Sequence, residues 1–146
     1  TRRSSDLKFT QTIGIGVTSI GEGGDYYTQN YKDLHHYEKA LDLGHLPVER
    51  GVALTKEDAL RKEVIMQMMS NLKLDYSKIE EKFSVDFKAH FKKELEKLKP
   101  YEEAGLLVFN PKGFEMTRTG GMLVRNMAME FDAYLRGGEK HFSKTL

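Results

Sequence analysis

The sequence has 146 residues, 39% hydrophobic and 31% charged, which suits one compact domain or a small domain with a strip of its neighbour. Because cysteine is absent, these residues hold no thiolate zinc site, cysteine-ligated iron–sulfur cluster or cysteine nucleophile. The 23 Lys and Arg nearly balance the 22 Asp and Glu, so the composition lacks the basic excess of proteins that bind nucleic acid.

The sequence shows no sign of a membrane segment. Residues 1–6 are followed by no apolar stretch of the kind found in signal peptides. No apolar run approaches the ~20 residues of a membrane span. We therefore expect a cytoplasmic protein with neither a membrane nor nucleic acid as its partner. Since Thr1 stands where an initiator methionine would be and a strand-like segment follows almost at once, we also expect a portion of a longer protein.

The first fifty residues predict a strand, a loop and a helix. Residues 13–20 alternate β-branched residues with glycine, which predicts a buried strand that another group approaches closely. The glycine-rich residues 21–25 predict a loop. Residues 31–43 place apolar side chains at helical spacing and are followed by Gly44, which predicts a helix. An extended connector comes next, and we place the main domain boundary near Arg50.

Helical signals dominate the part after this boundary. Thr55 and Asp58 resemble a capping box, in which each residue caps the backbone of the other. They precede a stripe at helical period formed by Leu60, Val64, Ile65, Met68, Met69 and Leu72. A short helix is expected over residues 77–83. A longer one, beginning near residues 84–86, should end or kink at Pro100, because proline lacks the amide donor; its apolar face carries Phe87, Phe91, Leu95 and Leu98.

The last third of the sequence predicts a β-hairpin and a closing helix. Residues 106–109 and 114–117 are strand-like, and between them Pro111 and Gly113 occupy the positions that a type I turn favours. The closing helix carries Leu123, Met127, Phe131 and Leu135. Three helices, a hairpin and a helix are the order of a winged-helix-like domain. We therefore expect a mainly α fold with a small β-hairpin.

Chemical signals are few. Gly14 and Gly16 resemble a phosphate loop, but the third glycine and the directly following helix of the dinucleotide fingerprint are missing, so we interpret them as sites of close packing. At the end of the same segment, Ile20 is a candidate to cover an aromatic ring of a ligand, and a core position fits the sequence equally well. No histidine pairs with another at helical spacing, which argues against a metal site; the five are His35, His36, His45, His90 and His141.

A lysine-rich helix leaves one nucleic-acid hypothesis open. In a recognition helix, Lys88, Lys92, Lys93, Lys97 and Lys99 would contact phosphate. Glu94 and Glu96 interrupt that surface, so we favour a solvated helix face. The methionines of the preceding helix are typical of core filling and not of metal binding.

Three blocks of the sequence resemble one protein family. The first, Gly14-Ile15-Gly16-Val17-Thr18-Ser19-Ile20 with Gly24-Asp25-Tyr26-Tyr27-Thr28-Gln29-Asn30, resembles G-x-G-x-S-A-I…G-D-x-Y-x-Q-N. The second, Arg50-Gly51-Val52-Ala53-Leu54-Thr55 through Leu74-Asp75-Tyr76, resembles R-G-x-A-L-T…L-D-Y. The third contains Arg125-Asn126, Phe131-Asp132 and Tyr134-Leu135-Arg136. The blocks are similar to the oxygen-independent coproporphyrinogen III oxidases, which are radical S-adenosylmethionine enzymes of haem synthesis.

The resemblance implies a division of the chain. Residues 1–30 would be the final strand and loop of an incomplete (β/α) barrel, residues 31–50 a connecting helix and linker, and residues 51–146 the helical C-terminal domain. The barrel of the same protein would be the partner of this domain. Its C-x-x-x-C-x-x-C motif, absent here, would hold a 4Fe–4S cluster.

The resemblance also implies an activity and a site. The full-length enzyme would decarboxylate two propionates of coproporphyrinogen III oxidatively, giving protoporphyrinogen IX. Of this chain, Ile20 and its neighbour Ser19 would contact S-adenosylmethionine, with no catalytic or metal-binding residue. We expect the chain alone to be inactive. Two alternatives are the haem chaperones of the same superfamily and a winged-helix DNA-binding module.

Overall fold

The computed structural model describes residues 11–136, and the chain divides into two compact units between Ala59 and Leu60. The sequence analysis placed this boundary near Arg50. In the structure Arg50 lies inside a strand that pairs with the preceding strand, so the pairing carries the first unit past it.

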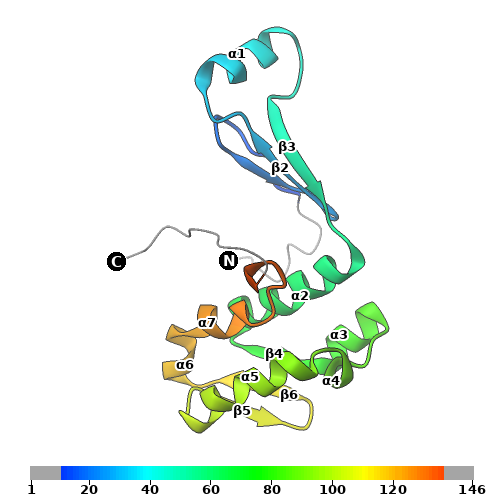
Figure 1. Ribbon diagram of the computed structural model, residues 1–146, viewed down its shortest axis with the longest axis vertical. Helices are drawn as coiled ribbons and strands as arrows, with labels where there is room; N and C mark the ends of the chain where they lie inside the picture. The colour runs from blue at the N-terminus through cyan, green and yellow to red at the C-terminus, as the bar shows by residue number, and fades with distance from the viewer. Residues whose placement is uncertain (1–10, 137–146) are drawn as a thin grey trace, which may run out of the picture. The chain divides into compact units, whose positions relative to one another are not determined.

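The first unit is a three-stranded antiparallel sheet with one inserted helix (Figure 1). Strands β1 (Ile20–Glu22), β2 (Tyr26–Asn30) and β3 (Val48–Ala53) lie in the order β1-β2-β3. Helix α1 (Leu34–Asp42) connects β2 to β3 and confirms the helix expected over residues 31–43. Asp33 caps its start by accepting a hydrogen bond from the backbone of His36, which also lowers the pKa of the Asp33 carboxyl.

The buried strand expected over residues 13–20 is wrong. Only Ile20 of these residues belongs to a strand, and residues 13–19 form an irregular loop. Ile13 is 82% exposed and Ile15 is 85% exposed. The alternation with glycine suggested an extended backbone, whereas Gly16 and Thr18 adopt positive φ angles of 94° and 63° and turn the chain.

The second unit begins with a long helix and continues with alternating helices and strands (Figure 1). Helix α2 (Lys56–Asn71), which starts just before the unit boundary, is followed by β4 (Lys73–Asp75), α3 (Tyr76–Phe83), α4 (Phe87–His90) and α5 (Lys92–Glu103). The hairpin β5 (Leu107–Asn110) and β6 (Gly113–Met116) comes next, then α6 (Arg118–Met122), α7 (Val124–Met129) and a 3-10 turn over Tyr134–Arg136.

Two local predictions are confirmed, one at the start of α2 and one in the hairpin of the second unit. The capping box forms, because the backbone N–H of Thr55 donates to the Asp58 carboxylate at 2.8 Å and the Asp58 N–H donates to the Thr55 hydroxyl at 3.1 Å. The predicted hairpin also forms, with Asn110 opposite Gly113. A third strand, β4, joins it to give the order β4-β6-β5. Strand β4 is only three residues long, too short for an alternation signal.

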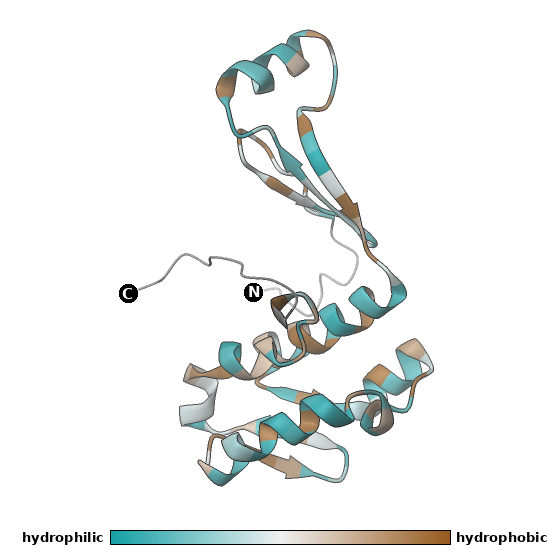
Figure 2. Cartoon of the chain, viewed as in Figure 1, coloured by the Kyte–Doolittle hydropathy of each residue, from teal (hydrophilic) through white to brown (hydrophobic). Residues whose placement is uncertain are grey.

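All the fully buried hydrophobic side chains of the described residues lie in the second unit. The stripe of α2 supplies Leu60, Val64 and Met68, while Met69 and Leu72 of the same stripe are exposed. Figure 2 shows apolar and hydrophilic bands along the same helices, as expected of helices with one buried face. The largest members of this core are Phe87, Phe91, Phe114, Phe131, Met68, Ile79, Leu98, Leu107 and Met127.

One buried ion pair connects the chain just after α7 to this core. Arg61 donates to the carboxylate of Glu94 at 3.1 Å and to the backbone carbonyl of Phe131 at 2.9 Å. Its guanidinium also lies 5.2 Å from the centre of the Phe91 ring. Because Glu94 is only 8% exposed, the pair satisfies a charge that would otherwise be costly to bury.

Two helix predictions differ from the structure. Helix α5 does not end at Pro100 but continues to Glu103. Pro100 is exposed, so the carbonyl that loses its donor lies on the solvent side, and the break falls at Phe91 between α4 and α5 instead. The closing helix is also divided, at Leu123, which is 41% exposed. Met127 and Phe131 of its predicted stripe are buried.

Candidate functional site

The loop over residues 14–19 lies directly before Ile20 and is folded tightly on itself. A Cβ atom added to Gly14 would lie 2.9 Å from the Cβ of Ser19 and 3.0 Å from the carbonyl carbon of Ile20. Only glycine allows this approach of backbone to backbone. The glycine predicted to permit close packing therefore does so, but its neighbour is the loop itself.

Asn30 holds this loop from the end of β2. Its side chain is buried, with the residue 5% exposed, and the Nδ2 atom donates to the carbonyls of Gly14 and Gly16, both at 3.0 Å. The backbone N–H of Asn30 donates to the carbonyl of Ser19 at 2.9 Å. A single asparagine thus fixes the start, the middle and the end of the loop.

Two further hydrogen bonds connect the loop to α1 and to Tyr31, which precedes α1. The N–H of Thr18 donates to the Tyr31 carbonyl at 2.8 Å, and the N–H of Gly16 donates to the Tyr37 hydroxyl at 3.0 Å. These bonds fix the two residues with positive φ. The loop is therefore a defined structure that positions whatever follows it.

The two residues that the sequence analysis singled out lie at the exit of this loop. Ile20 pairs with Gln29 across β1 and β2, and its residue is 59% exposed. The hydroxyl of Ser19 donates to the carbonyl of Ile15 at 2.5 Å, so its proton is already engaged inside the loop. Ile20 is an apolar side chain offered at the surface. Nothing in the structure tests whether it contacts a ligand, and that role stays a prediction.

Sequence reasoning missed Asn30 as the residue that organises this region. It appeared only as the last letter of a family-like segment, because its partners lie 14 and 16 residues earlier in the chain. A buried asparagine at the end of a strand is the available signal, since such a side chain needs partners for both donors.

Other candidates from the sequence take part in local contacts. His36 stacks on Tyr31 with ring centres 5.7 Å apart, and its Nδ1 atom lies 2.8 Å from the Asp33 carboxylate. Over residues 11–136, no group of three His, Asp or Glu side chains has a metal-binding arrangement. Lys97 and Lys99 pair with Glu130 and Glu96, at 3.5 and 2.6 Å. Among the described residues no helix meets the length and apolarity needed to cross a membrane.

Comparison with known proteins places the chain. Residues 54–123 match the HemN C-terminal domain. The chain is 96% identical over 139 residues to an oxygen-independent coproporphyrinogen III oxidase of Helicobacter pylori strain 26695, a match that covers 95% of this chain and 30% of the relative. The chain belongs to the oxygen-independent coproporphyrinogen III oxidase family. The resemblance found in the sequence is thereby confirmed.

More distant members of the oxidase family agree. The oxygen-independent coproporphyrinogen III oxidase of Escherichia coli K12 is 39% identical over 127 residues, which cover 87% of this chain and 28% of that protein. The solved structure of the Escherichia coli coproporphyrinogen III oxidase HemN, described as a radical SAM enzyme, aligns with a TM-score of 0.81 at 38% identity, over 86% of this chain and 29% of that one. The chain thus spans about three tenths of the length of these relatives.

Proposed function

We propose that this chain acts as the C-terminal part of a radical S-adenosylmethionine enzyme that oxidises coproporphyrinogen III to protoporphyrinogen IX in the cytoplasm. The observation that supports this proposal most directly is the 96% identity over 139 residues to an oxygen-independent coproporphyrinogen III oxidase. A haem chaperone or a DNA-binding module finds no such support, since the relatives described above are all named as the oxidase.

The second unit would be a winged-helix-like domain that covers the active-site side of the barrel. Its helix–strand–helix–helix–helix–hairpin order, with the sheet β4-β6-β5, supports that assignment. Residues 1–30 would end the barrel, and residues 31–50 would connect it to the helical domain. The barrel of the same protein is then the partner of this domain. The open sheet of the first unit, which has none of the fully buried hydrophobic side chains described above, fits a segment completed by neighbouring strands.

The residues present fit one of the two cofactors. A 4Fe–4S cluster needs thiolate ligands, and with no cysteine in the sequence the ligands would belong to the rest of the longer protein. S-adenosylmethionine bound beside this cluster would supply the radical that starts the reaction. Toward that cofactor, Ile20 offers an exposed apolar side chain on a loop fixed by Asn30.

The role of this chain is then to position and to cover. Ile20 would bury part of the adenine or the alkyl chain of S-adenosylmethionine and exclude water from it. Ser19, whose proton is held by Ile15, would contact the cofactor only through its free lone pairs or its backbone. No proton transfer is assigned to either residue.

The test uses a chimera in which this chain replaces the matched region of the Helicobacter pylori relative. Ile20→Ala should weaken S-adenosylmethionine binding by about 1–2 kcal/mol, from lost apolar contact, at an unchanged Tm. Val52→Ala is the matched control, because Val52 is likewise a β-branched strand residue and is 54% exposed. A lower Tm with unchanged affinity would show that Ile20 is a packing residue and that the site assignment is wrong.

A further inference from the structure

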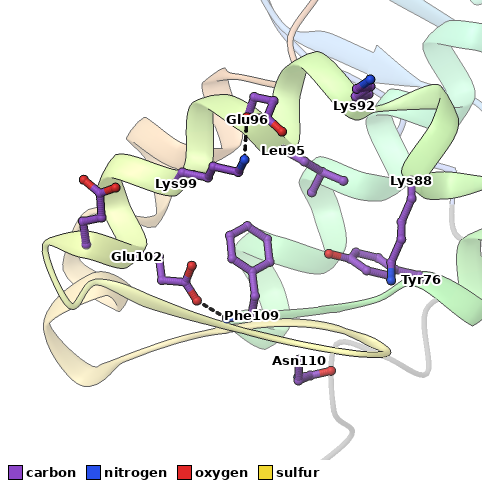
Figure 3. Close-up of a pocket in the computed structure, with 10 residues that line it drawn as sticks. Tyr76, Lys88, Lys92, Leu95, Glu96, Lys99, Glu102, Phe109 and Asn110 are labelled. Carbon is purple, nitrogen blue, oxygen red and sulfur yellow. Dashed lines mark hydrogen bonds and ion pairs between the residues drawn. The ribbon is translucent and has the colours of Figure 1, made fainter.

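A hollow of about 420 Å³ lies in the second unit between helices α4–α5 and the β5–β6 hairpin (Figure 3). Its apolar surface comes from Tyr76, Leu95 and Phe109. Lys88 and Lys92 also line it, and the Lys88 ammonium lies over the Tyr76 ring. All of these residues belong to one compact unit, so the hollow does not depend on how the two units are arranged. It is also distinct from the loop that precedes Ile20.

Tyr76 is held rigidly at the floor of this hollow. It is 5% exposed, its ring stacks on Phe87 with centres 4.6 Å apart, and its backbone N–H donates to the Lys112 carbonyl at 2.9 Å. Phe114 meets the same ring edge-on at 6.3 Å. A tyrosine fixed in this way presents its hydroxyl in one direction.

That hydroxyl is the unsatisfied group of the hollow. Within residues 11–136 it makes no hydrogen bond, although every fully enclosed side-chain N or O atom of this part has a partner. The oxygen must therefore reach the hollow, and Figure 3 shows it directed into the space beside Phe109. Burial raises the pKa of Tyr76 to about 12, so the phenol, which is protonated at neutral pH even at its ordinary pKa, remains a donor well into the alkaline range.

The lining of the hollow carries both signs of charge, on Lys88, Lys92 and Lys99 and on Glu96, Glu102 and Glu103. At one end the Lys99 ammonium is already paired with Glu96 at 2.6 Å, and Glu102 accepts from the Phe109 N–H at 3.1 Å (Figure 3). At the Tyr76 end the ammonium of Lys88 lies 5.6 Å from the Tyr76 ring centre and 3.4 Å from a backbone carbonyl. Lys92, one helical turn before Glu96 in α5, has no carboxylate partner among the described residues. Near Tyr76 the hollow therefore offers the Lys88 ammonium and an O–H donor with no protein partner within residues 11–136.

We propose that this hollow binds a small carboxylate with an apolar body. The carboxylate accepts a hydrogen bond from Tyr76 and lies near the ammoniums of Lys88 and Lys92, while the body lies on Leu95 and Phe109. A hydrogen bond from a buried donor to a charged acceptor is stronger than one between neutral groups, so the anion is favoured over a neutral ligand of the same shape. The volume is within the usual range of small-molecule sites.

The binding test uses the 146-residue chain and 3-phenylpropionate as the probe, followed by backbone amide NMR. We expect saturable shifts at Phe109 and Asn110, and much weaker binding of the neutral analogue 3-phenylpropanamide. Added salt should lower the affinity for 3-phenylpropionate more than the affinity for the amide, because the carboxylate is partly attracted by exposed lysines. Absence of saturable shifts, or equal binding of the two probes, would overturn the proposal.

Variants separate the assigned roles. Tyr76→Phe keeps the ring that stacks on Phe87 and removes only the hydroxyl, so affinity should fall about tenfold. Lys92→Gln alters an exposed side chain, so it should leave folding unchanged and weaken binding about twofold to threefold. Lys93→Gln, the adjacent exposed lysine outside the hollow, should leave it unchanged. Equal affinity of Tyr76→Phe and the parent chain, or equal losses at Lys92 and Lys93, would refute this assignment.

Discussion

Replacing Asn30 by aspartate tests how the loop before Ile20 is held. The change preserves shape but turns the Nδ2 donor into a carboxylate oxygen, which faces the carbonyls of Gly14 and Gly16. Two hydrogen bonds of 3.0 Å are lost, each worth about 1 kcal/mol. Opening of the loop should therefore become easier by about 2 kcal/mol, or about thirtyfold.

Amide hydrogen exchange measures this opening directly. The N–H of Thr18, which donates to the Tyr31 carbonyl at 2.8 Å, should exchange about thirtyfold faster in Asn30→Asp. Gln29→Glu is the matched control: it makes the same amide-to-carboxylate change at the neighbouring residue, removes one exposed 3.3 Å bond to the Thr18 carbonyl, and keeps the oxygen that accepts from Arg50. Unchanged exchange at Thr18, or equal acceleration in both variants, would refute the claim that Asn30 fixes the loop.

Two further predictions concern stability. In Gly120→Ala the new Cβ would lie 1.6 Å from the Leu106 carbonyl oxygen, and this backbone clash should lower the free energy of unfolding in urea by more than about 3 kcal/mol. The adjacent Gly121→Ala is the control, because its Cβ meets only a flexible leucine side chain at 3.2 Å and stability should be nearly unchanged. Equal losses of stability in the two variants would contradict this packing. The pKa of Tyr76 is raised to about 12 in the folded protein, whereas the unfolded phenol ionises near 10. Its contribution to the free energy of unfolding, about 2–3 kcal/mol, is therefore complete below pH 10 and is lost as the pH rises to 12. Tyr76→Phe should abolish that part of the alkaline loss in unfolding curves, and an unchanged difference between pH 9 and pH 12 would refute it.

Local rules were sufficient for two elements of the second unit, α2 and the hairpin. The capping box of Thr55 and Asp58 and the stripe from Leu60 to Met68 depend on residues within one or two turns, so the sequence predicts α2 correctly. The hairpin likewise follows from its own turn residues. Strand β4 has only three residues and is defined by pairing with β6, about forty positions later, which no local pattern reveals.

The strand prediction for residues 13–20 failed for a physical reason. Residues 13–20 have strand-like composition, but their conformation is set by two positive φ angles and by hydrogen bonds from Asn30, a long-range partner. The alternation of β-branched residues with glycine indicates which side chains could share a face, but it does not reveal where the backbone turns. The family resemblance nevertheless identified Ile20 as a residue at a defined place, and the structure leaves it exposed at the end of that loop. Its contact with the cofactor stays a prediction.

The most direct test of the central claim is an anaerobic turnover assay with reductant, S-adenosylmethionine and coproporphyrinogen III. The chimera that carries this chain in place of the matched 30% of the Helicobacter pylori relative should form protoporphyrinogen IX. The 146-residue chain alone should form none, because it has no cysteine to hold a cluster. Turnover by the isolated chain, or an inactive chimera that folds and retains its cluster, would contradict the account.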